Sequence, residues 1–240
     1  MSLLANIAEK AQSTQAQDME ERVSSGSSKR IEESGCYTAV VTMAKLREAQ
    51  SGAIGIDIEL KTEDEKEIKI TEWIQSGDAK GNKTTYTDKE GNEVNLPGFT
   101  KVKNINFLIN GVFGLPTGET KQIKEYSWDE KKDILVTREV ITSWINRPVG
   151  ICVQMTMEDK YNAENEFTTR PIIEHFYDAV TNQFGSEKMS SKEAELKEKF
   201  LTYIEKTPIK DKRKKSKGAT EASGATNNTQ TTQTSTDVGF

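Results

Sequence analysis

The sequence has few of the residues on which reactive or oxidised sites depend. It contains two cysteines, Cys36 and Cys152, and a single histidine, His175. The cysteines lie far apart within apolar runs, unlike the dense spacing of a disulfide framework or a zinc knuckle. We therefore predict buried, reduced thiols and a half-buried histidine in a strand. No metal site, no cofactor and no catalytic residue is expected.

Hydrophobic residues are also scarce, at 34% of the chain, against roughly 45 to 50% in a typical globular protein. No stretch approaches the roughly 18 apolar residues of a membrane-spanning helix. Residues 1–10 lack the charged start and apolar run of a secretory signal. We expect a cytoplasmic protein with no membrane partner, part of which never packs into a core.

Charge is distributed unevenly along the chain. The net charge is −5, yet residues 206–217 hold seven basic residues and one acid, a net of +6. Since residues 218–240 carry −2, residues 1–205 carry −9. A body this acidic binds a polyanion only through a local basic and aromatic face.

Composition divides the chain into three parts. Residues 1–33 combine a marginal amphipathic helix with a flexible serine-rich link, and residues 34–206 form the folded domain. Residues 207–240 contain the basic run and then Thr, Gln, Asn, Ser and Gly, which cannot bury enough apolar surface to offset the entropy of ordering. We predict a disordered tail.

The folded domain is predicted to be mainly β. Alternating apolar residues indicate antiparallel strands, followed by a long polar loop at residues 77–99 that is typical of a functional flap. The expected strands are residues 36–43, 54–60, 68–74, 134–136, 150–157 and 168–177, and the expected helices are residues 104–112, 139–145 and a last one carrying Leu196, Phe200 and Ile204. Such an order fits a small closed or partly closed barrel, for example the five-stranded Greek-key type, with elaborated loops, a C-terminal helix and disordered termini.

Two ligand motifs fail on inspection. Residues 114–120 superficially match a phosphate-binding loop, but the glycine spacing is one residue short and Glu119 stands where a lysine is needed. Residues 88–93 resemble half of a calcium loop without its closing glutamate, which favours a solvated hairpin tip.

An acid-x-lysine pattern, Asp57, Glu59 and Lys61, is found in some metal-dependent nucleases. An amphipathic strand that buries Ile56, Ile58 and Leu60 gives the same spacing and is the favoured interpretation.

Aromatic and basic residues are interleaved along the predicted strands and loops. Exposed rings stack on any base, and nearby lysines neutralise phosphates, so together they are what a single-strand binder requires. Core packing of the rings is the alternative. The candidate residues are Tyr37, Lys45, Lys69, Trp73, Lys83, Tyr86, Phe99, Lys101 and Lys103.

Several short segments, in this order, resemble a family of bacteriophage single-stranded DNA-binding proteins. They are SGCYTAVVTMA at 34–44, YTDKEG at 86–91, LPGF at 96–99, VITSWI at 140–145 and PVGI at 148–151. The resemblance covers residues 34–177. It implies an OB-fold body and base stacking on Tyr37, Trp73, Tyr86 and Phe99.

The tail departs from the acidic, aromatic-ended tails that many such proteins use to recruit partners. Only Asp237 and Phe240 keep that character, as a candidate contact for replication or recombination proteins. The cluster Lys212, Arg213, Lys214 and Lys215 instead predicts extra, nonspecific affinity for DNA.

These observations predict a nonenzymatic, sequence-nonspecific single-stranded DNA-binding protein that protects single strands during phage DNA replication or recombination in the infected host cell. The alternative is a phage structural or adaptor protein whose barrel binds another protein.

Overall fold

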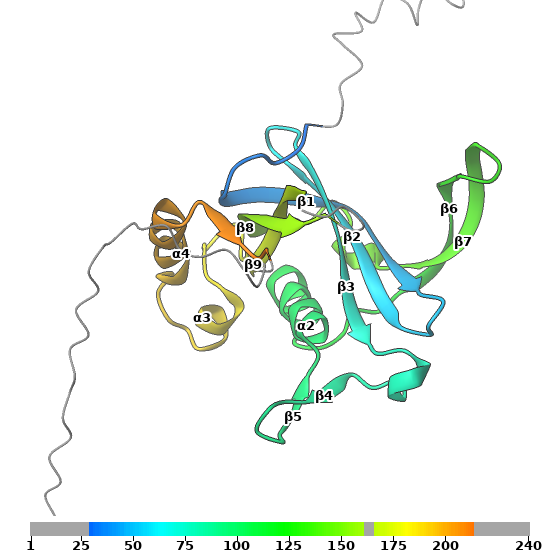
Figure 1. Cartoon of the computed structure of the whole chain (residues 1–240), viewed down its shortest axis with the longest axis horizontal. Coiled ribbons are helices and arrows are strands. Elements are labelled where there is room, and N and C mark those ends of the chain that lie inside the picture. Colours follow the sequence, from blue (N-terminus) through cyan, green and yellow to red (C-terminus); the bar gives the residue numbers. More distant parts are fainter. Residues whose placement is uncertain (1–28, 161–165, 214–240) are drawn as a thin grey trace, which may run out of the picture.

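One long strand organises the sheet of this protein (Figure 1). The computed structural model describes residues 29–160 and 166–213, and its first strand, β1 (Gly35–Glu48), has neighbours on both edges. One edge pairs with β2 (Ile54–Thr62). The other edge pairs with β8 (Pro148–Asp159) over the first half of β1 and with β7 (Lys132–Val140) near the end of β1.

The strand order of the main sheet is β10-β8-β1-β2-β3, with β9 paired to β8 and β6 paired to β7. A separate two-stranded sheet joins β4 and β5. The remaining elements are β3 (Glu67–Gln75), η1 (Asp78–Lys80), β4 (Thr85–Thr87), β5 (Glu93–Asn95), α2 (Pro97–Asn110), β6 (Glu119–Ser127), η2 (Thr142–Trp144), β9 (Phe167–Tyr177), α3 (Gly185–Met189), α4 (Leu196–Lys206) and β10 (Ile209–Asp211).

The main core lies between the curved sheet and α2. Alternation in β2 buries Ile56, Ile58 and Leu60 to 2% exposure or less, as the sequence predicted. Burying side chains of this size contributes roughly 1.5 to 3 kcal/mol each. On α2, Val102 and Ile105 face the same core.

A second apolar cluster lies where α4 covers the start of β1 and the part of β8 that pairs with it. It contains Cys152, Tyr177 and Phe184 together with Phe200 and Ile204 of α4. The sequence predicted the apolar face of this last helix correctly.

The chain is mainly β, as predicted, but the expected five-stranded barrel differs from the observed sheet. The main sheet has eight strands, and among the described residues no backbone pairing joins β3 to β9. Helix α2 contacts both strands. There the Lys101 ammonium lies 2.9 Å from a carboxylate oxygen of Glu72 on β3 and 3.3 Å from the carbonyl oxygen of Ile173 on β9.

Two predicted helices have different bounds or a different conformation. Residues 139–145 were expected to be helical, but β7 continues to Val140 and a single 3-10 turn follows. This turn buries Ile141 and Trp144, which produces helix-like spacing without a helix. Helix α2 begins at Pro97, before the predicted residues 104–112, because proline suits the first turn.

Both ends of the folded part extend beyond the predicted boundaries of 34 and 206. Ile31 is 1% exposed and packs in the main core. Strand β8 extends past the start of β1, and β10 pairs in parallel with the edge left there, placing Ile209 opposite Met155. The first residues of the predicted tail are therefore part of the sheet.

A buried amide connects α2 to the turn after β7. Asn106 is 3% exposed, and its Oδ1 accepts a hydrogen bond of 3.1 Å from the indole nitrogen of Trp144, which is fully buried. Its Nδ2 donates to the carbonyl oxygens of Val112 and Gly114, both at 3.1 Å. One side chain thus positions a helix, a buried ring and the chain leading to β6.

We expect Asn106→Ala to lower the free energy of unfolding by about 2 to 4 kcal/mol, because the buried indole N–H loses its acceptor. The control is Asn110→Ala, an exposed amide on the same helix that donates to the same Asn106 Oδ1 at 2.9 Å. This variant leaves the acceptor of the Trp144 indole in place and should cost under about 1 kcal/mol. Urea denaturation measures both values. Equal losses in the two variants would contradict this role for Asn106.

Candidate nucleic-acid interface

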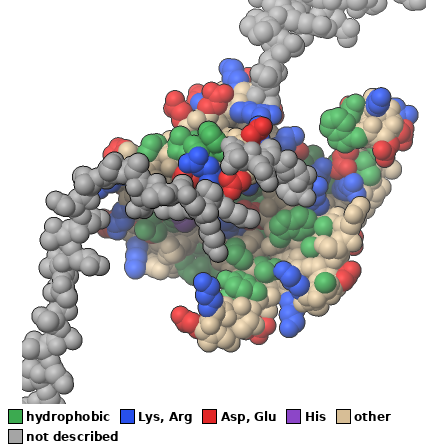
Figure 2. Space-filling model, viewed as in Figure 1, with side chains coloured by type: hydrophobic (Ala, Val, Ile, Leu, Met, Phe, Trp, Pro, Cys, Tyr) green, Lys and Arg blue, Asp and Glu red, His purple; other side chains and the backbone are tan. Residues whose placement is uncertain are grey.

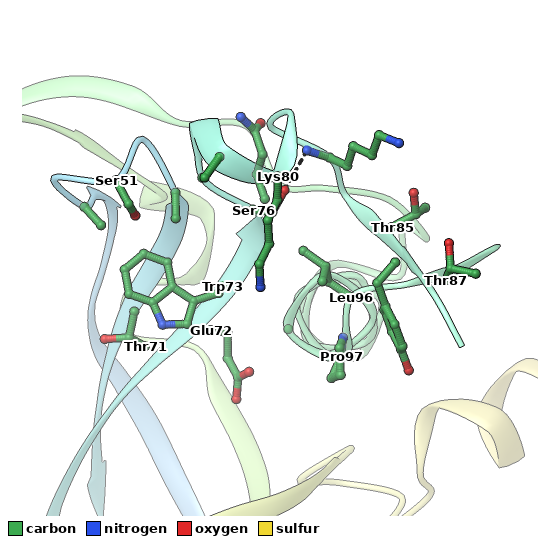
Figure 3. A pocket seen from close by; sticks show the side chains of 18 residues that line it. Ser51, Thr71, Glu72, Trp73, Ser76, Lys80, Thr85, Thr87, Leu96 and Pro97 are labelled. Atoms are coloured by element: carbon green, nitrogen blue, oxygen red, sulfur yellow. Dashed lines mark hydrogen bonds between the residues drawn. The ribbon is translucent and has the colours of Figure 1, made fainter. Parts of the chain in front are cut away.

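A hollow lies where β3 ends and the chain turns toward α2 (Figure 3). Its volume is about 830 Å³, within the range of small-ligand sites. It is lined by the β1–β2 turn, β3, η1, β4 and the start of α2. Figure 3 shows Trp73 on one side, Leu96 and Pro97 on the other, and the Lys80 side chain extended into the space between them.

Backbone hydrogen bonds hold the walls of the hollow together. The amide of Asp78 donates to the carbonyl oxygen of Ser51 at 2.8 Å, which fixes η1 to the β1–β2 turn. The amide of Ser76 donates to the carbonyl oxygen of Lys83, also at 2.8 Å. The polar residues 77–99, predicted to be a long loop, are thus tied to the sheet at several points.

Helix α2 reaches the hollow because Gly98 has no side chain. A Cβ on Gly98 would lie 2.4 Å from the carbonyl oxygen of Trp73 and 2.7 Å from its backbone nitrogen. Any other residue there must push the helix away from β3. The backbone contact therefore sets the position of Trp73 relative to Leu96 and Pro97.

The hollow presents two partly exposed rings. Trp73 is 40% exposed and Tyr86 is 46% exposed, and both line the space. Rings that are half covered keep their orientation and still present a face on which a base can stack.

Its charge is positive. Lys80 and Lys83 line the space, and neither forms an ion pair with another described residue. The acid in its wall, Glu72, is neutralised by Lys101 at 2.9 Å. The structure thus brings together three of the sequence-predicted residues, Trp73, Lys83 and Tyr86.

Other predicted lysines take part in intramolecular contacts. The Lys45 ammonium lies 2.5 Å from the Glu125 carboxylate, which Arg138 also binds at 2.9 Å. Hydrogen bonds from Arg138 and then from Lys45 lower the pKa of Glu125 to about 2. Lys45 therefore anchors the β6–β7 hairpin. Lys69 pairs with Glu59 at 3.2 Å on the outer face of β3.

The remaining predicted rings belong wholly or partly to the core. Tyr37 packs against the core, and its hydroxyl donates to the carbonyl oxygen of Glu33. Desolvation raises the pKa of this phenol. Phe99 also packs against the core, with the Lys103 ammonium 5.5 Å from its ring centre and 4.3 Å from that of Phe113.

The acid-x-lysine face of β2 consists of surface contacts. Asp57 accepts a hydrogen bond of 2.6 Å from Thr71, Glu59 pairs with Lys69, and Lys61 lies 3.1 Å from Glu65. Within the described ranges, no group of three or more His, Cys, Asp or Glu side chains could hold a metal ion.

The basic run begins beside β8, away from the hollow. The backbone nitrogen of Lys212 donates to the carbonyl oxygen of Met157, and Arg213 binds Asp211 and lies 5.2 Å from the ring centre of Phe167. In the strand order, β8, β1 and β2 separate β10 from β3. Lys214, Lys215, Asp237 and Phe240 lie outside the described residues.

Sequence reasoning missed two features. Lys80 lies in a three-residue turn whose packing against the β1–β2 turn has no sequence signature.

The β6–β7 hairpin was expected only as a short strand, yet it projects from the body with Trp128 83% exposed and in edge contact with Tyr126. Figure 2 shows hydrophobic side chains on this projection among charged ones. The sequence signal that could have identified this hairpin is the charged turn that follows Trp128.

No protein-family model matches this chain, and no curated protein matches its sequence. Among the described helices, none is both long enough and apolar enough to cross a membrane.

We expect Gly98→Ala to shift the Trp73 emission to longer wavelength and to destabilise the protein by about 1 to 3 kcal/mol, because the added methyl group meets the β3 backbone. The control is Gly114→Ala, whose added Cβ would meet no atom within 4 Å. Fluorescence spectra and thermal unfolding check both. An unshifted spectrum in Gly98→Ala would show that the helix contact does not set the environment of Trp73.

Proposed function

We propose that this protein is a nonenzymatic, sequence-nonspecific single-stranded DNA-binding protein. The observation that carries the proposal is the hollow itself, in which partly exposed Trp73 and Tyr86 accompany Lys80 and Lys83. The rings stack on bases of any identity, and the two ammonium groups neutralise phosphates. Because Glu72 is already paired, no free carboxylate of the wall repels the DNA backbone.

The strand order supports an OB-type arrangement. We assign β1, β2, β3, β8 and β9 to the five strands of that fold, with α2 between the third and the fourth. OB-folds bind oligonucleotides on strands 2 and 3 and on the loops between strands 1 and 2 and between strands 4 and 5. The hollow lies at β3 and at the β1–β2 turn, the place where such a fold binds DNA.

The proposed biological role follows the resemblance of residues 34–177 to bacteriophage single-stranded DNA-binding proteins. The protein would cover single strands exposed during phage DNA replication or recombination in the host cytoplasm. Sequence-tolerant contacts suit this role, because every exposed strand has to be bound.

The projecting β6–β7 hairpin favours the alternative role, that of a phage structural or adaptor protein. Its exposed Tyr126, Trp128 and Leu135 are typical of a protein-contact surface. The two roles predict different results for one measurement, the quenching of Trp73 fluorescence by oligo-dT: DNA binding predicts quenching and the adaptor role predicts none.

We expect Trp73→Ala and Tyr86→Ala each to weaken binding of oligo-dT by roughly 5- to 150-fold, the equivalent of about 1 to 3 kcal/mol of stacking per base. The anisotropy of a dye-labelled oligo-dT measures the affinity of every variant, and quenching of Trp73 itself is followed in a Trp128→Phe background. In that background the remaining tryptophans are Trp73 and the fully buried Trp144.

The matched control is Trp128→Ala, which removes an exposed tryptophan outside the hollow and should leave the affinity unchanged. An equal loss in Trp128→Ala and Trp73→Ala would move the site to the hairpin. Unquenched fluorescence and no binding in the parent protein would favour the adaptor role.

The basic run is expected to add nonspecific affinity. Truncation after Arg213 removes Lys214, Lys215 and Lys217 but retains β10, so the sheet stays intact. We expect weaker oligo-dT binding and a salt slope smaller by about 0.7 for each lost phosphate contact. The measurement is affinity against salt concentration.

Truncation after Lys217 is the control, because it removes the terminal Asp237 and Phe240 and keeps the basic run. It should leave DNA affinity unchanged while abolishing any protein contact made by the terminus. Identical affinity and slope in the full chain and in the chain ending at Arg213 would show that these lysines only solvate the tail.

A further inference from the structure

Two free thiols face each other across the β1–β8 strand pair. Cys36 lies directly opposite Cys152 in the register, and their Sγ atoms are 3.0 Å apart. The Val41 amide donates to the Arg147 carbonyl oxygen. Hydrogen-bonded and non-hydrogen-bonded pairs alternate along an antiparallel ladder. Because Cys36 comes five residues before Val41, Cys36 and Cys152 form a non-hydrogen-bonded pair, in which Cα atoms lie about 4.5 Å apart.

This spacing suits a covalent bond without movement of the backbone. Disulfides span Cα separations of about 4.4 to 6.8 Å and have S–S lengths near 2.05 Å, so the two sulfurs need to approach by only about 1 Å. The β1 and β8 backbones are held in register on both sides of the pair.

The two sulfurs differ in their access to solvent. Cys36 is partly exposed, whereas Cys152 is completely buried beneath α4. The hydrogen bond from Cys152 lowers the pKa of Cys36, and the nearby Lys197 ammonium acts in the same direction. The hydrogen bond to Cys36 and burial raise the pKa of Cys152. Cys36 is thus the attacking sulfur and Cys152 the resolving one.

We propose that Cys36 and Cys152 form a modification site at which a low-molecular-weight disulfide converts the thiol pair into a reversible cross-strand disulfide. The Cys36 thiolate attacks one sulfur of the reagent and releases the first thiolate. The Cys152 sulfur, its proton transferred to that thiolate, then attacks Cys36 and displaces the second. Two electrons pass from the protein to the reagent, which is reduced to two thiols.

The experiment uses the full chain and oxidised glutathione. We expect the number of free thiols, counted after denaturation, to fall from two to none and the intact mass to fall by two hydrogen atoms. Peptide mapping should join Cys36 to Cys152, and dithiothreitol should restore both thiols. The thermal midpoint of the oxidised protein should rise by roughly 5 to 15 °C, because the bond closes a long loop in the unfolded chain.

Single variants separate the two roles. Cys152→Ala should keep a glutathione adduct on Cys36, since the resolving sulfur is gone, and Cys36→Ser should acquire no adduct. Two surviving thiols, a lasting adduct on the parent protein, a cross-link between chains or an unchanged midpoint would each overturn the proposal. The outcome does not depend on DNA binding.

Discussion

The fold depends on the double pairing of β1. A strand of 14 residues is long enough to hold β2 along one edge and both β8 and β7 along the other. A register shift between Val41 and Met43 in the pairing with β2 bends the strand where its partner changes from β8 to β7. Val41 and Ala44 then face the core with no exposure, and α2 closes the open side of the sheet.

That arrangement also produces the hollow. Since α2 lies between β3 and β9, the helix must begin close to the end of β3, and Gly98 permits the approach. The polar segment between β3 and α2 lines the hollow beside the end of β3 and leaves Trp73 40% exposed. The concave site is therefore a consequence of how the sheet is closed.

The pattern of apolar and polar residues along the chain predicted the elements whose buried face is set by their own sequence. Strict alternation at Ile56, Ile58 and Leu60 identified β2, and one-face spacing identified the buried residues of α4. It failed where distant segments decide the conformation, as at β10, whose pairing depends on the length of β8, and at Trp144, whose burial depends on Asn106. In the same way, no sequence pattern distinguishes Lys45, which is paired with Glu125, from Lys83, which forms no ion pair with another described residue.

Pairing of that kind determines which charges are available to a ligand. The folded body is acidic overall, and several lysines, Lys45, Lys69 and Lys101 among them, are paired with a carboxylate. A paired lysine must break its contact before it neutralises a phosphate, whereas an unpaired one loses only water. Positive potential on an acidic protein therefore concentrates where carboxylates are absent or already neutralised. The wall of the hollow meets that condition, because its one acid, Glu72, is already paired with Lys101, while Lys80 and Lys83 form no ion pair with another described residue.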